Sequence, residues 1–345
     1  MTDLTRLGPL KIALDHQMVV SALADHETVS IDIDGTAVPL LIPLKIMTWF
    51  NQDFFGRNHE IQSERIFYVN QYLLDSEKDI DLVYSLGLGL WPGRFLVTQT
   101  FDRHVGRIGS ILQRAADRVG TTIRRVPLLG TDDALEDFFE ISLDIPEAPT
   151  DGASLTSWQD MFESDVELRR YQDSIRIISD PDSTSIDSLL ALYENCMRPL
   201  SDGHPIRAEL DLEVLSTILA TGNACIIAKW VERNPVALLL VVSDIALLDW
   251  LEPSYFSASY PGQFLNIPAI ATAPTARGVT HSASLASVLT RLTILSVRKG
   301  VMAFSCNNES RRYTPRIVRR ALERTCRDAA LSLSHTYVYS GWRVG

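Results

Sequence analysis

The stretch Pro-Thr-Ala-Arg-Gly-Val-Thr-His-Ser-Ala-Ser-Leu, from Pro274 to Leu285, decides the fold of this chain. An apolar run from Phe264 to Ala273 precedes it, and a helical pattern from about Ala283 to Lys299 follows it. This order predicts a strand, a short loop and a helix. The first turn of a helix leaves N–H groups unpaired and carries the positive end of the dipole, so such a loop can hold an anion. Arg277 and Gly278 favour a phosphate, while the simpler alternative is an ordinary strand–turn–helix connection.

Charge is distributed unevenly along the 345 residues, whose net charge is −11. From Ala271 to Gly345 there are twelve Lys or Arg and three Asp or Glu, so this last part is strongly basic and the rest strongly acidic. The basic part contains the candidate phosphate loop, which favours an anionic ligand there. The alternative is a solvated basic helix face.

Length and composition predict a folded, cytoplasmic protein of two domains. The longest apolar run, Val236 to Val242, suits a buried strand and is too short to span a membrane. The first residues lack a basic region followed by an apolar core, so we expect no signal peptide. The four cysteines have no close pair, which argues against a disulfide framework or a metal site and for a reducing compartment.

A linker is predicted at Asp144 to Ser157, where prolines, a glycine and small polar residues gather. It places the two domains at residues 1–150 and 151–345. In the first half the patterns predict a hairpin around Asp34-Gly35, then strands and helices in the following ranges: strands 28–33, 36–43, 94–101 and 121–128, and helices 104–119 and 132–141.

The second half repeats this order of elements. Asn234-Pro235 is expected to break two strands like a hairpin turn. The predicted ranges are helices 186–197, 208–219, 279–299 and 315–330, and strands 224–231, 236–244, 246–251, 264–273, 301–306 and 337–344. Each half therefore reads as an α/β (α+β) domain in which helices lie on the faces of a mixed sheet.

The second half resembles the GCN5-related N-acetyltransferase superfamily. The likeness rests on the strand, the loop Pro274-x-x-Arg277-Gly278-x-Thr280-x-Ser282, the apolar stripe of the following helix, and a strand ending in Cys306-Asn307-Asn308. The resemblance implies that Ile270, Ala271 and Thr272 form a strand edge that pairs with the pantetheine arm of coenzyme A. It also implies a pyrophosphate loop made of these residues: Arg277, Gly278, Val279, Thr280, His281 and Ser282.

Two departures from the family pattern concern the binding of the acyl donor and the residue that acts as general acid. Thr280 and Ser282 stand where the family has small residues, usually glycine, and a Cβ there crowds a phosphate held by the backbone. The resemblance implies Asn307 near the reaction centre and Tyr313 as general acid, although Tyr313 lies closer to the asparagine than the family's tyrosine does.

The whole chain resembles the tandem members of the superfamily, which include Fem-like transferases that use aminoacyl-tRNA. Trp158 to Asp173 is similar to the bridging helix at the start of their second domain. The fold expected is therefore two tandem domains of this type, each a mixed, mainly antiparallel sheet with helices on both faces. The segment Arg103 to Arg107 after strand 94–101 matches the phosphate loop poorly, so we assign the donor site to the second half.

A predicted helix from Thr314 crowds arginines on one face, at spacings where like charges repel. An anionic partner would relieve this repulsion, and a tRNA backbone would do so more fully than coenzyme A. The arginines concerned are Arg316, Arg319, Arg320 and Arg324.

Attack by an amine needs a base to accept a proton, and Asp249 and Glu252 flank a predicted strand end. The sequence thus predicts a transferase that moves an acyl group from acyl-CoA to the nitrogen of a small-molecule amine, without a metal and without a membrane. One alternative is an aminoacyl-tRNA-dependent transferase with tRNA as partner. The other is a non-catalytic protein of this fold that binds a ligand.

Overall fold

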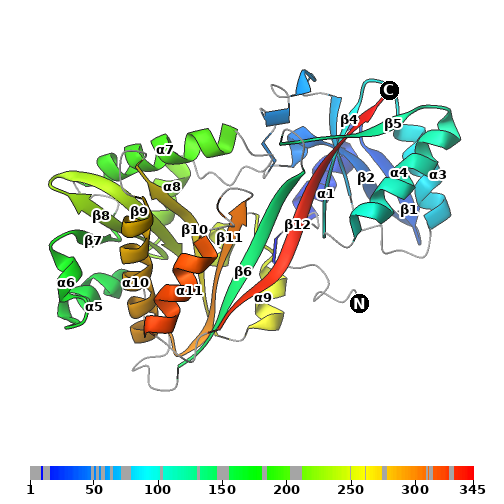
Figure 1. The fold of residues 1–345 in the computed structure, drawn as a ribbon. Helices are drawn as coiled ribbons and strands as arrows, with labels where there is room; N and C mark the ends of the chain where they lie inside the picture. The colour runs from blue at the N-terminus through cyan, green and yellow to red at the C-terminus, as the bar shows by residue number, and fades with distance from the viewer. Residues whose placement is uncertain are drawn as a thin grey trace. The chain divides into compact units, whose positions relative to one another are not determined.

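The computed structural model contains two compact units (Figure 1). One unit holds Leu10–Glu136, Ser201–Arg207 and His335–Gly345, and the other holds Met1–Pro9, Asp137–Leu200 and Ala208–Ser334. We call them the N-terminal and the C-terminal unit. The structure describes residues 9–10, 16–47, 50–51, 54–55, 59–62, 65–70, 79–101, 104–129, 133–145, 155–180, 185–202, 212–248, 250–260, 262–273, 278–307, 310, 314–325 and 330–345.

The N-terminal unit is a mixed sheet covered by helices. Its strands are hydrogen-bonded in the order β1-β2-β3-β4-β12, with β5 also on β12; the pair β3–β4 is parallel and the other pairs are antiparallel. Its elements are α1 (His16–Ala24), β1 (Val29–Ile33), β2 (Thr36–Pro43), the 3-10 turn Leu44–Ile46, β3 (Ile66–Val69), α3 (Asp79–Gly89), β4 (Phe95–Phe101), α4 (Val105–Val119), β5 (Ile123–Val126) and the end of β12 (Ala330–Val344).

The C-terminal unit is built in the same way, in the strand order β6-β11-β10-β9-β8-β7. The pair β10–β11 is parallel, and the pairs from β10 to β7 are antiparallel. Its elements are β6 (Ala134–Asp144), α5 (Trp158–Ser164), α6 (Arg169–Gln172), β7 (Ile175–Ile178), α7 (Ile186–Asp202), α8 (Leu212–Ala220), β8 (Ala224–Val231), β9 (Asn234–Val242), α9 (Pro253–Ser259), β10 (Gln263–Thr272), α10 (Gly278–Ser296), β11 (Lys299–Asn307) and α11 (Thr314–Thr325).

The two units share one order of elements. The succession β1-β2-β3-α3-β4-α4 in the first half corresponds to β8-β9-β10-α10-β11-α11 in the second, with the crossover helix between the two parallel strands in each case. The final strand of each half contributes to the other unit, because Asp137–Asp144 of β6 joins the C-terminal unit and His335–Val344 of β12 joins the N-terminal unit. The mixed, mainly antiparallel α/β architecture confirms the expected fold class.

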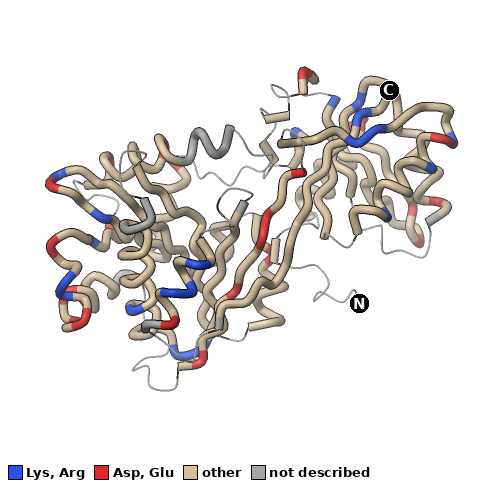
Figure 2. The backbone as a smooth tube through the Cα atoms, in the orientation of Figure 1, with Lys and Arg blue, Asp and Glu red and all other residues tan. Residues whose placement is uncertain are grey.

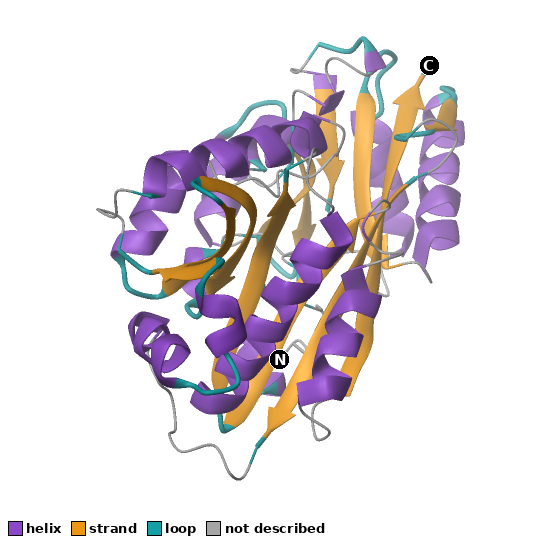
Figure 3. Cartoon of the chain, turned by 60° about the vertical axis from the view of Figure 1, so that its left-hand side comes forward, coloured by secondary structure: helices purple, strands orange, loops and turns teal. Residues whose placement is uncertain are grey.

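Helices bury both faces of the sheet in the C-terminal unit. On one face, α10 and α11 lie side by side against the sheet (Figures 1 and 3) and share a core with α5. Leu285, Val288 and Leu292 of α10 are fully buried there, so the apolar stripe has the structural role expected of it. On the other face, Phe256 of α9 contacts Phe264 at a ring distance of 4.8 Å.

Several elements differ from the sequence-based expectation. The predicted helix at 132–141 is strand β6, and the predicted strand at 246–251 is a 3-10 turn, Ile245–Leu247, followed by an isolated bridge. The hairpin between β8 and β9 turns at Glu232, whose φ is 57°, so Asn234 and Pro235 already belong to β9. The structure also divides the chain before Asp137, whereas the predicted linker lies at 144–157.

The first hairpin forms as its sequence requires. Asp34 and Gly35 both have positive φ, 52° and 81°, as a two-residue turn between strands of right-handed twist demands. Asp32 stabilises this turn because its Oδ1 accepts a hydrogen bond from the N–H of Gly35 at 2.9 Å.

Candidate functional site

The candidate site begins where the parallel strands β10 and β11 stop pairing. Their register runs from Gln263 opposite Gly300 to Asn266 opposite Ala303, although β10 continues to Thr272 and β11 to Asn307. Asn266 is buried at this point, and its Nδ2 donates to the carbonyl of Ala303 at 3.2 Å. Beyond this point, the C-terminal parts of β10 and β11 do not pair with each other.

A bulge in β10 accompanies this separation. Against β9, the register shifts between Asn266 and Ala269, so β10 has one residue more than its neighbour. Pro268 lies inside the bulge and has no N–H to donate, which suits a place where a ladder is interrupted. Beyond the bulge, Ala269 to Thr272 pair regularly with β9 on one side only.

The other side of this segment contains the predicted edge residues Ile270, Ala271 and Thr272. Ala271 is buried and the other two are half-buried, and β11 pairs with none of the three. A strand edge in this state offers backbone N–H and C=O groups to an extended ligand with amides of its own. The assignment of these three residues to the donor stays a prediction, which their lack of pairing with β11 permits.

The helix α10 starts six residues after β10 ends, and the two are joined by a side-chain contact. Thr272 Oγ1 and Ser282 Oγ lie 3.3 Å apart. No acidic residue occupies the first turn of α10, so nothing in that turn opposes an anion at the positive end of the helix. Arg277 lies outside the described residues, and for Gly278, Val279 and Thr280 the structure describes the helical backbone alone.

Lys229 of β8 supplies a cation beside this helix start, which sequence reasoning missed. Its Nζ donates to Ser284 Oγ at 3.4 Å. Burial lowers the pKa of the nearby His281, and the charge of Lys229 lowers it further. His281 Nδ1 is buried and has no hydrogen-bond partner among the described residues. The only available signal was a single charge in an otherwise apolar strand, Ala-Cys-Ile-Ile-Ala-Lys-Trp-Val.

The structure describes only some of the predicted catalytic residues. Asp249 and Tyr313 lie outside the described residues, and Asn307 is the last residue of β11 with its side chain not described. Glu252 caps α9, since its carboxylate accepts from the N–H of Ser254 at 3.2 Å and from the Ser254 hydroxyl. This contact gives Glu252 a structural role, and its assignment as a base stays a prediction.

A second carboxylate in the same unit, Glu140 of β6, is buried to 2% exposure. The hydroxyl of Tyr260 donates to its Oε2, while Oε1 has no hydrogen-bond partner among the described residues. Burial, followed by the interaction with Glu140, raises the pKa of both Tyr255 and Tyr260. Sequence reasoning missed this cluster because it assigned Glu140 to a helix.

The arginine face of α11 is present in the structure. Arg316, Arg319 and Arg320 are exposed on this helix, while Val318 and Leu322 are buried. Figure 2 colours the backbone of Lys and Arg residues blue along the chain. Arg324 belongs to the same helix, and its side chain is not described. The strip therefore presents several positive charges to solvent on the helix that packs beside α10.

Among the described residues, the start of α3 in the N-terminal unit differs in charge from the start of α10. By element order, β3 and α3 are the counterparts of β10 and α10. The equivalent of the phosphate loop therefore follows β3, and the segment after strand 94–101 is not its counterpart, contrary to the sequence-based expectation. The connection 71–78 lies outside the described residues, but α3 begins with Asp-Ile-Asp from Asp79. Carboxylates in the first turn complement the helix dipole themselves and repel an anion. This difference supports a donor site in the C-terminal unit.

Within the described ranges, no group of three or more His, Cys, Asp or Glu could hold a metal ion. No helix among these residues is long and apolar enough to cross a membrane.

No protein-family model and no curated protein matches the sequence. Among solved structures, a GCN5-related N-acetyltransferase from Sphaerobacter thermophilus is 13% identical, with 80% of this chain and 71% of that chain covered at a TM-score of 0.41. A tandem GNAT protein from the clavulanic acid biosynthesis pathway is 9% identical, with 98% and 90% covered at 0.43.

The C-terminal domain of a lysylphosphatidylglycerol synthetase from Agrobacterium fabrum is 11% identical, with 79% of this chain and 76% of that domain covered at a TM-score of 0.31. Structures that resemble this chain thus include GCN5-related acetyltransferases, one of them a tandem protein. One fold hosts many activities, so function depends on the residues of this chain.

Proposed function

We propose that this chain is an N-acyltransferase whose C-terminal unit binds an acyl-CoA and passes the acyl group to a small-molecule amine. The observation that carries the proposal is the end of β10–β11 pairing at Asn266 and Ala303. It leaves an open strand edge that leads directly towards a helix start free of acidic residues. The tandem GNAT-type neighbour is consistent with this class of reaction.

The successive parts of coenzyme A match the open edge of β10 and the start of α10 in order. Its pantetheine arm is extended and contains two amides, which can pair with the backbone of Ile270 to Thr272 as an added strand would. Its pyrophosphate then reaches the N-terminus of α10, where free N–H groups and Lys229 meet negative charge. The acyl thioester lies at the other end of the arm, towards the residues where β10 and β11 separate.

In the proposed reaction the neutral amine attacks the thioester carbonyl, the C–N bond forms and the C–S bond breaks. Backbone N–H groups of the open edge stabilise the negative charge on the carbonyl oxygen. A carboxylate accepts the proton that the amine loses, and the thiolate of coenzyme A leaves. Glu252, Asp249 and Glu140 are the candidate bases, and holding both substrates in one complex supplies much of the rate.

Calorimetric titration with acetyl-CoA tests the donor. We expect binding that weakens about tenfold or more in Lys229→Met, because a half-buried lysine would no longer donate a charged hydrogen bond to phosphate. Lys299→Met, which removes an exposed lysine at the start of β11, is the matched control and should bind like the parent. Absence of acetyl-CoA binding in the parent would rule out this donor.

Aminoacyl-tRNA is the second candidate donor, and the exposed Arg316, Arg319 and Arg320 are the observation that favours it. Binding of charged tRNA should weaken linearly on a plot of log affinity against log salt, with a slope that falls when these three arginines become Gln. If neither donor binds, the chain is a non-catalytic protein of this fold. The acceptor amine and the cytoplasmic location also remain parts of the proposal.

A further inference from the structure

Helix α3 of the N-terminal unit is apolar on the side that faces away from its core. Its inner side is formed by Leu82, Leu86 and Leu90, which are buried to 1% exposure or less. The outer side carries large apolar residues at helical spacing, each more than half exposed: Ile80 at 76%, Tyr84 at 51%, Leu88 at 56% and, just past the helix end, Trp91 at 61%. We call these four residues the α3 stripe.

Such a helix is unusual for a surface position. Surface helices turn mostly polar or charged residues to water, whereas the exposed side chains of α3 beyond Asp81 are large and apolar. The inner side is already tightly packed, since a Cβ on Gly89 would lie 2.6 Å from Val29 Cγ2. The helix therefore cannot roll inwards to cover the α3 stripe. Large exposed apolar side chains that recur along one side of a helix are typical of an interaction surface.

The two ends of α3 carry opposite charge. Asp79 and the exposed Asp81 stand at its start, and the helix contains no Lys or Arg. At its end, Arg94 donates to the carbonyl of Gly89 at 2.7 Å and stacks on Trp91, and the exposed Arg65 lies against Gly93. Eleven residues of helix separate these ends by roughly 16 Å.

We propose that the α3 stripe is a homodimer interface, in which α3 packs antiparallel on α3 of a second copy about a two-fold axis. This arrangement places Tyr84 against Leu88 of the other copy and Ile80 against its Trp91, because the stripe is symmetric about its midpoint. It also brings each acidic start towards a basic end, so that Asp81 faces Arg65 of the second copy. A second copy thus offers apolar side chains to the stripe and opposite charges to its two ends, while the exposed Arg118 of α4 lies over the ring of Tyr84 at 5.0 Å.

The interface is independent of the acyltransferase proposal. Four large side chains on each copy make a small interface, so we expect a dimer dissociation constant in the micromolar range. Sedimentation velocity of the full chain over a wide concentration series measures this association. Leu88→Lys should weaken it about tenfold or more, because a charge would be buried at the centre of the contact.

Charge reversal separates this geometry from general stickiness. Asp81→Arg or Arg65→Asp alone should weaken the dimer, and the double variant should restore it, since the pair is re-formed with reversed sign. Val214→Lys on α8, another exposed apolar helix position at 41%, is the control and should dimerise like the parent. Circular dichroism checks that each variant is folded.

A parent that stays monomeric at every concentration would overturn the proposal. So would a dimer that persists in Leu88→Lys or that shows no rescue in the double variant. Acetyl-CoA binding is measured in a separate experiment. A monomeric protein would therefore say nothing against the donor site, and a lack of acetyl-CoA binding would say nothing against the dimer.

Discussion

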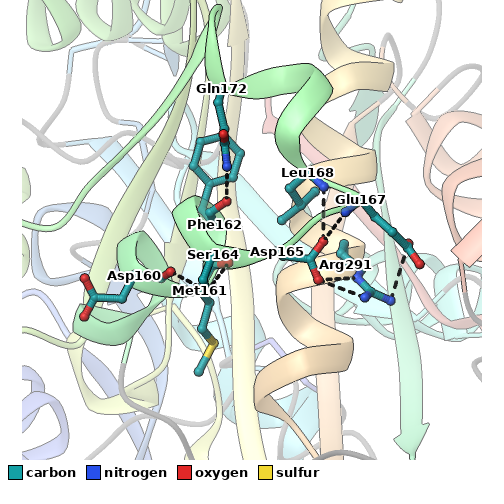
Figure 4. Close-up of polar contacts among 9 residues, drawn as sticks. All are labelled: Asp160, Met161, Phe162, Ser164, Asp165, Glu167, Leu168, Gln172 and Arg291. Carbon is teal, nitrogen blue, oxygen red and sulfur yellow. Dashed lines mark hydrogen bonds and ion pairs between the residues drawn. The ribbon is translucent and has the colours of Figure 1, made fainter.

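Asp165 should contribute strongly to the stability of the unit that carries the candidate site. Its Oδ2 accepts from Arg291 Nε at 3.1 Å and Nη2 at 2.8 Å, which ties the turn after α5 to the middle of α10 (Figure 4). Its Oδ1 accepts from the N–H groups of Glu167 at 2.8 Å and Leu168 at 3.1 Å. The side chain is only 9% exposed, and that of Arg291 is 24% exposed.

The magnitude follows from the groups left behind. Asp165→Ala deprives the N–H of Glu167 of its acceptor, at about 1 kcal/mol, and leaves the Arg291 charge without its closest partner, at about 1 kcal/mol or more; the N–H of Leu168 keeps the backbone carbonyl of residue 165, which it contacts at 3.2 Å. We expect the free energy of unfolding to fall by about 2 kcal/mol. Asp165→Asn keeps the acceptor oxygen and loses the charge, so about half of this loss should remain. Asp160→Ala, an exposed acid on α5, is the control and should change the free energy by less than about 1 kcal/mol.

Urea unfolding at several pH values is the assay. Burial raises the pKa of Asp165, but hydrogen bonding and charge from Arg291, together with the two N–H groups, outweigh it and hold the pKa below its ordinary value of 3.8. The ionised form is therefore stabilised by folding, so its contribution is complete above pH 3.8 and is lost as pH falls through the lower folded value. Equal losses in Asp165→Ala and Asp160→Ala, or a loss in Asp165→Asn that does not shrink in acid, would refute this reasoning.

Three further outcomes are expected. Gly300→Ala should destabilise the chain by about 2 kcal/mol or more in urea unfolding, because the new Cβ would lie 2.0 Å from the carbonyl oxygen of Gln263. Gly106→Ala, in the first turn of α4, should instead stabilise the chain slightly, because the new Cβ would meet nothing within 4 Å. Lys229→Met should move the pKa of His281 up towards its ordinary value in an NMR titration, whereas Lys299→Met should not. Alkylation of the native protein should spare Cys225, since it is fully buried and burial raises the pKa of its thiol; modification as fast as in the unfolded chain would contradict this.

The strands and helices around the site follow from local pattern, because there burial and periodicity agree. The pattern placed β10 at 264–273 and α10 at 279–299, and the structure has Gln263–Thr272 and Gly278–Ser296. The range 224–231 coincides with β8. These elements have long apolar runs or a regular stripe, which only one kind of secondary structure can bury.

The sequence failed where distant partners decide the structure. Residues 132–141 combine acidic side chains with apolar ones at helical spacing, yet Ala134–Asp144 form β6. The strand is possible because other parts of the chain supply partners for its buried carboxylates: Tyr339 donates to Glu136 at 3.4 Å, and Tyr260 donates to Glu140. No local pattern contains those tyrosines. Lys229 was missed for the same reason, since its importance depends on α10, which lies 49 or more residues further along the chain.

The duplicated order of elements sharpens the assignment of roles to the two units. The crossover helices α10 and α3 occupy equivalent places between parallel strands, so their differences reflect residues and not topology. The start of α10 has no acidic residue and lies beside Lys229, which suits a phosphate. The start of α3 is acidic and its outer side is apolar, which disfavours a phosphate there and is the basis of the proposed protein interface. Lys229→Met should therefore weaken acetyl-CoA binding and leave self-association unchanged, whereas Leu88→Lys should weaken self-association and leave acetyl-CoA binding unchanged.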